Sequence, residues 1–115
     1  MNQPIQLPRE ISDGNDREVR TLLSDRTRKL VLIQLRRGAL LADHSAKFPI
    51  TIQAVLGKGT LRVEPDAHAL LPGVIVPVDA QVVHSVQAEP AVAILVSFFR
   101  HGEITSEDDT TARFE

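Results

Sequence analysis

Hydrophobic and polar residues alternate through the middle of the chain with the period of a β-strand. Between residues 50 and 56, Ile50, Ile52, Ala54 and Leu56 are apolar, and Thr51 separates the first two. Successive side chains of a strand point to opposite faces, so such a segment buries one face. No window has the apolar spacing of an amphipathic helix. The pattern predicts strands at about 17–23, 28–37, 40–47, 50–56, 60–64, 69–71, 74–77, 82–88 and 91–99.

Short strands separated by Gly, Pro and Asp turns indicate an all-β fold, a small antiparallel β-barrel or jelly roll with little helix. The 115 residues suffice for one domain. We expect an N-terminal arm over 1–15, the β-barrel over 16–100, and an acidic C-terminal tail or short helix over 101–115.

The runs 30–35 and 91–96 are predominantly apolar on both faces. A strand that is apolar on both faces is covered on both. In so small a protein we expect the second cover to be another subunit, which predicts a homodimer. Cover by the N-terminal arm or by the C-terminal tail is the alternative.

Composition excludes several classes of function. Cys is absent, which excludes disulfides, thiolate metal sites and a Cys nucleophile. The net charge is −2, and the chain has no Trp, no Tyr and four Phe, so we expect neither a nucleic-acid partner nor a membrane partner. Seven basic residues between Arg17 and Arg37 are interpreted as a solvated or subunit-bridging edge. No secretory signal is visible, and we expect a cytoplasmic location.

Two of the four histidines fall on apolar strand faces, whereas His68 and His101 are expected at the solvated surface. By alternation His44 shares a face with Leu40, Ala42 and Ala46, and His84 shares one with Val82, Val86 and Ala88. A buried pair loses its protons readily, and it could bind a carboxylate or act as acid and base. The alternative is that each ring is a neutral core residue with its own hydrogen-bond partner.

The stretch from about 29 to 99 resembles a small single-domain cupin of the RmlC-like superfamily. The resemblance lies in the strand rhythm, in the phrase PITIQAVLGKGTLRV, in the spacing from Gly38 to His44 and in HSVQ at His84. It implies a compact antiparallel β-barrel whose interior holds a divalent metal on three histidines and a glutamate. Ala46 replaces the second histidine, and an Ile stands where the glutamate belongs, so only His44 and His84 remain.

These observations predict a cupin-fold protein that binds a small organic ligand in an apolar barrel cavity, with its metal site weakened or lost. No catalytic residue is assigned. The alternative is a metal-dependent cupin enzyme of the dioxygenase or isomerase type that uses His44 and His84, and a third is a purely structural or partner-binding cupin. The predicted cavity lining is Leu40, Ala42, Ile50, Ile52, Val82 and Val86, with Phe99 as a further candidate.

Overall fold

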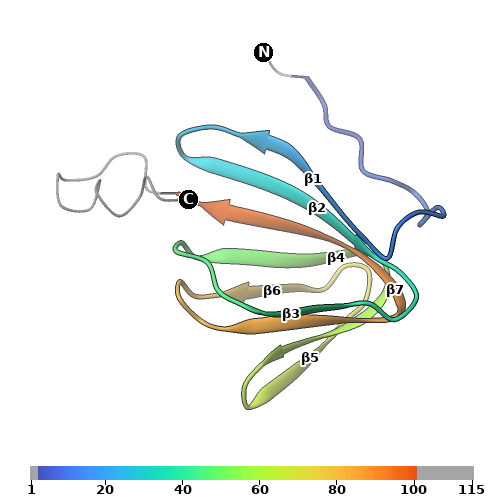
Figure 1. Cartoon of the computed structure of the whole chain (residues 1–115). Helices are drawn as coiled ribbons and strands as arrows, with labels where there is room; N and C mark the ends of the chain where they lie inside the picture. The colour runs from blue at the N-terminus through green and yellow to red at the C-terminus, as the bar shows by residue number, and fades with distance from the viewer. Residues whose placement is uncertain (1–2, 101–115) are drawn as a thin grey trace, which may run out of the picture.

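The computed structural model describes residues 3–100, which form seven β-strands and no helix (Figure 1). Residues 3–16 precede the first strand without regular secondary structure, and the tail predicted at 101–115 lies outside the described residues. The strands are β1 (Arg17–Ser24), β2 (Arg28–Leu35), β3 (Leu40–His44), β4 (Ile50–Val63), β5 (Asp66–Leu70), β6 (Ile75–Val78) and β7 (His84–Phe99).

All strand pairs are antiparallel, and they join in one seven-stranded sheet. The order along the sheet is β1-β2-β7-β4-β5, while β3 pairs with β7 and β6 pairs with β4. Both long strands therefore have more than two partners, and the sheet curls so that β3, β5 and β6 face the other strands (Figure 1). The predicted all-β jelly-roll fold is confirmed.

The prediction of separate strands at 50–56 and 60–64, and at 82–88 and 91–99, is wrong. Each pair is one long strand, β4 or β7. The register of β4 against β7 shifts between Ala54 and Leu56 and again between Gly57 and Gly59. Gly57 has φ 77°, and a Cβ there would collide with the carbonyl oxygen of Ala91. The glycines thus form bulges that bend a continuous strand, instead of the hairpin turn that the sequence pattern predicted.

Three other predicted boundaries also move. The strand predicted at 40–47 ends at His44, the one predicted at 28–37 ends at Leu35, and the one predicted at 69–71 begins at Asp66. Arg37 and Gly38 both adopt positive φ, of 53° and 71°, which turns the chain immediately after β2. Ends of strands are set by such turns and by the available pairing partner, and neither follows from alternation alone.

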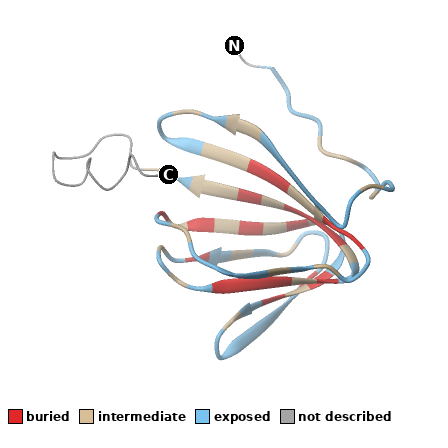
Figure 2. Cartoon of the chain, in the orientation of Figure 1, coloured by how far each residue is buried: buried red, intermediate tan, exposed pale blue. Residues whose placement is uncertain are grey.

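The core lies between the two curled halves of the sheet, and Figure 2 shows buried positions along the middle of the long strands. Leu35, Ala54, Leu61, Val92 and Ile94 are fully buried there. Alternation explains this for β4 and β7, because the inward positions 50, 52 and 54 pair with 98, 96 and 94. Residues 3–100 contain no helix that could span a membrane.

The outer face of the sheet is partly covered within a single chain. Leu32 and Ala93 point away from the main core, yet only 2% and 0% of their surfaces are exposed. Ile11, in the lead-in segment, places its side chain beside Gly57. These positions therefore need no second subunit to be buried, and the homodimer stays a prediction.

The cluster of basic residues is largely paired inside the chain. Arg28 forms an ion pair with Asp25 at 2.7 Å, and this hydrogen bond holds the pKa of Asp25 at about 2. Arg37 forms an ion pair with Asp16 at 2.5 Å. Arg36 is buried against the lead-in segment, which a solvated edge does not explain. Its guanidinium donates to the carbonyl oxygens of Ser12 and Asn15, at 2.7 and 2.8 Å, and pairs with Glu18.

Candidate functional site

The structure brings His44 and His84 together. β3 pairs with the first part of β7, and the two histidines face each other in that register. Their ring centroids are 4.2 Å apart and their ring planes are tilted by 58°. The two residues are forty positions apart in the sequence, so only the antiparallel pairing of β3 with β7 makes them neighbours.

Each imidazole forms a hydrogen bond to a backbone carbonyl group two residues earlier in the chain. Nδ1 of His44 lies 3.0 Å from the carbonyl oxygen of Ala42, and Nδ1 of His84 lies 3.0 Å from that of Val82. A carbonyl oxygen can only accept, so Nδ1 is the protonated nitrogen of both rings. In the neutral rings Nε2 then carries a lone pair and no proton. The two Nε2 atoms cannot hydrogen-bond to each other unless a proton is added.

The two rings differ in exposure. His84 is 2% exposed, and its Nε2 is buried with no hydrogen-bond partner. His44 is an exposed residue at the end of β3. Burial lowers the pKa of His84 below its ordinary value of 6.5, and the neighbouring His44 lowers it further, while the hydrogen bond to Val82 opposes the shift. His84 is therefore neutral at physiological pH.

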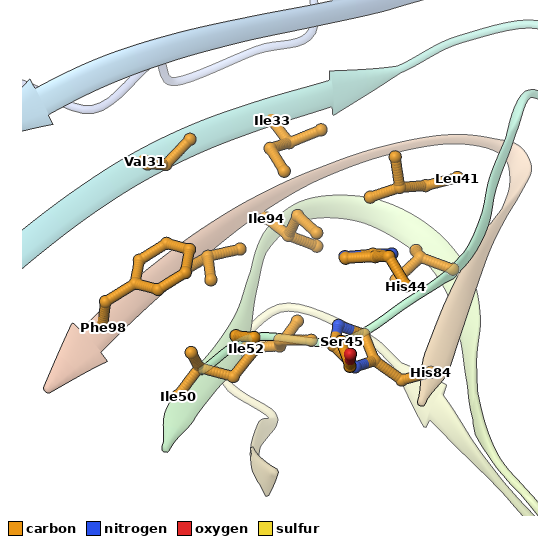
Figure 3. A pocket seen from close by; sticks show the side chains of 13 residues that line it. Val31, Ile33, Leu41, His44, Ser45, Ile50, Ile52, His84, Ile94 and Phe98 are labelled. Carbon is orange, nitrogen blue, oxygen red and sulfur yellow. The ribbon is translucent and has the colours of Figure 1, made fainter. Parts of the chain in front are cut away.

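The rings stand at one end of an apolar cavity of about 210 Å³ (Figure 3). Phe98 lies at the opposite end in this view, and Nζ of Lys29 sits 5.2 Å from the centre of its ring. Apart from the two histidines, Ser45 is the only polar residue that residues 3–100 contribute to the wall. The cavity is lined by Val31, Ile33, Leu41, His44, Ser45, Ala46, Ile50, Ile52, His84, Val86, Ile94, Val96 and Phe98.

Three of the seven residues predicted to line the cavity, Ile50, Ile52 and Val86, lie in its wall, and the other four do not. On β3, Leu40 is 50% exposed and Ala42 is also exposed, whereas Leu41 lines the cavity with His44. The register shift between Leu41 and His44 breaks the alternation that had placed Leu40, Ala42 and His44 on one face.

Val82 and Phe99 are displaced from the cavity for different reasons. Val82 precedes β7, in a turn in which its backbone N–H donates to the carbonyl oxygen of Asp79. It lines a second, polar cleft with Asp43 and Arg62, and His84 lines both this cleft and the apolar cavity. Phe99 is 51% exposed because it lies on the outward-facing side of β7. Phe98 has the inward parity of His84 and Val86, so continuing the alternation along β7 would have found it.

Sequence reasoning also missed the residues that β2 contributes. Val31 and Ile33 enter the wall because β2 pairs with β7, with Val31 opposite Val96 and Ile33 opposite Ile94. In the sequence, β2 is apolar at nearly every position, so alternation did not indicate which residues face inward. His68 lies exposed on β5, away from the cavity, and His101 falls outside the described residues.

The residues present do not fit the metal that the cupin resemblance implies. In a neutral imidazole whose Nδ1 donates, Nε2 has the form that binds a metal, but a catalytic site ordinarily needs three protein ligands. Within residues 3–100 no group of three His, Cys, Asp or Glu side chains is placed to hold an ion. Ala46, Ile50 and Ile52, at the positions of the missing ligands, supply hydrocarbon to the wall.

Solved structures of the same architecture identify the fold. An RmlC-like cupin protein from Desulfovibrio desulfuricans superposes with a TM-score of 0.75, at 16% identity, over 85% of this chain and 97% of that one. The chain has a cupin fold. An RmlC-like cupin with a double-stranded β-helix fold from Methanocaldococcus jannaschii gives a TM-score of 0.72, at 21% identity, over 88% and 93% of the two chains.

An enzyme occurs among the structures that share this fold. The DMSP lyase DddQ from Ruegeria pomeroyi superposes with a TM-score of 0.70, at 13% identity, over 78% of this chain and 50% of that one. At these identities the likeness establishes the fold alone. No protein-family model matches the sequence of this chain, and no curated protein does.

Proposed function

We propose that this cupin binds a small organic molecule in the cavity between the halves of its sheet, with His44 and His84 as the polar contacts. The observation that carries the proposal is the Nε2 atom of His84, which is buried at the cavity without a hydrogen-bond partner. A buried acceptor left unpaired costs about 1–3 kcal/mol, and a bound molecule that donates to it removes that cost.

The size and lining of the cavity support a ligand with a mainly apolar body. A dry cavity of roughly 150 Å³ lined by aliphatic and aromatic side chains is enough to bind benzene. This cavity measures about 210 Å³, and ten of its thirteen wall residues are apolar. Small-ligand sites are commonly built this way, from an apolar lining with a few polar groups that orient the ligand.

Benzene and a pair of matched variants test whether the cavity is used. We expect saturating benzene to raise the midpoint of thermal unfolding, because a ligand at ten times its Kd stabilises the native state by about 1.4 kcal/mol. Ala46→Phe fills the cavity and should abolish the rise. Ala42→Phe is the control, because Ala42 is exposed outside the cavity. An equal rise in both variants would show that benzene binds elsewhere.

Metal analysis separates this proposal from a metal-dependent enzyme. Protein purified without an affinity column should hold far less than one equivalent of Fe, Mn, Ni or Zn, because the described residues offer two ligands. Near-stoichiometric metal that disappears in His44→Ala would instead favour the enzyme.

A further inference from the structure

We propose that the ligand of this cavity carries a neutral hydroxyl group, as in a phenol or an alcohol, and donates its proton to Nε2 of His84. This inference rests on the proposed function and goes further by naming the chemical class of the ligand. It excludes the carboxylate that a pair of histidines would suggest from the sequence.

The direction of the hydrogen bonds carries the argument. Both Nδ1 atoms already donate to backbone carbonyl oxygens, of Ala42 and of Val82. In neutral rings the remaining nitrogen is therefore an acceptor on both histidines. A carboxylate carries only hydrogen-bond acceptors, so its oxygens would face the lone pairs of the Nε2 atoms and form no hydrogen bond with them. A hydroxyl group brings one donor, and it can meet either Nε2 atom of the adjacent rings.

The described part of the wall carries no charge, which disfavours ionic head groups. None of the thirteen lining residues is Lys, Arg, Asp or Glu. Lys29 sits over Phe98, at the end of the cavity away from the histidines (Figure 3). Among the described lining residues, an ammonium group would find no carboxylate and a carboxylate would find no cation. Burying an unpaired charge costs far more than burying a hydroxyl group with an acceptor.

Three probes of similar shape separate the classes: p-cresol carries a hydroxyl group, p-xylene a methyl group in its place, and p-toluate a carboxylate. Isothermal titration at pH 8 measures each Kd, because phenolic hydroxyls ionise only near about pH 10. We expect wild-type protein to bind p-cresol more tightly than p-xylene, and p-toluate most weakly.

The ratio of the p-xylene Kd to the p-cresol Kd isolates the hydrogen bond from the apolar contacts. His84→Leu keeps a side chain of similar size and removes the acceptor, so the ratio should fall by about 5-fold or more. His68→Leu, on exposed β5, should leave the ratio unchanged. If His84→Leu does not fold, the ¹⁵N signals of wild-type His84 give the same answer, because p-cresol should shift Nε2 and p-xylene should not.

The outcomes distinguish the two proposals. A ratio that is the same in wild type and His84→Leu, with p-xylene still bound, overturns the hydroxyl class and leaves the ligand-binding cavity standing. The same unchanged ratio of Kd values is expected if only water molecules donate to the Nε2 atoms. Tighter binding of p-toluate than of p-cresol overturns the class as well. Failure of all three probes to bind overturns both proposals.

Discussion

Replacing His84 by Leu should make the protein more stable and should remove a pH dependence. In the wild type at pH 7.5, the buried Nε2 acceptor without a partner costs about 1–3 kcal/mol of stability, and the substitution removes this cost. It also removes the hydrogen bond to Val82, worth about 0.5–1.5 kcal/mol. The difference is a gain of about 1 kcal/mol in the free energy of unfolding.

The gain should grow as the pH falls. Burial lowers the pKa of His84 in the folded protein below its ordinary value of 6.5. At a pH between the folded and unfolded pKa values, the unfolded chain therefore binds a proton at His84 and the folded chain does not. His84 therefore leaves the free energy of unfolding undiminished above about pH 6.5. Below that pH the free energy of unfolding decreases progressively, down to the pKa of His84 in the folded protein, by at most about 1.4 kcal/mol per pH unit.

Urea denaturation of wild type and His84→Leu at several pH values between 5 and 8 measures both effects. The wild type should lose stability below pH 6.5, and the variant should lose less. His68→Leu is the matched control, because it removes an exposed histidine and leaves His84 in place. A wild-type stability that is equal at pH 5.5 and 7.5, or a variant that keeps the full wild-type slope, would refute the reasoning.

Three further pairs of substitutions test the packing of the fold. Ile52→Ala should cost about 2–5 kcal/mol of unfolding free energy in urea, because Ile52 is 1% exposed, whereas Ile75→Ala, at 55% exposure, should change it by less than about 0.5 kcal/mol. Arg36→Met should cost about 3 kcal/mol and speed trypsin cleavage at Arg9, since it frees the lead-in segment, while Arg20→Met, at an exposed position of β1, should not; equal cleavage in both would contradict this. Gly57→Ala should lower the thermal midpoint far more than Gly38→Ala, because both have positive φ but only Gly57 would collide with Ala91.

The fold class could be predicted from the sequence because it depends on local alternation and on the spacing of turn residues. The inward face of β4 follows the alternation as expected, with Ile50 and Ile52 inside. The number of strands could not be predicted, because residues such as Gly57 and Pro90 occur both in turns between two strands and in bulges or bends within one strand. Only the pairing partner decides between these alternatives.

The sequence by itself placed His44 and His84 on apolar strands, and it left two of the four expected metal ligands missing. Tertiary structure alone decided that the two rings meet, through the register of β3 on β7. A register shift, which no alternation pattern records, turned Leu41 into the cavity and Leu40 out of it. The orphaned Nε2 of His84 also arises there, because burial is a property of all the strands packed around a side chain and hydrogen-bond direction depends on three-dimensional neighbours.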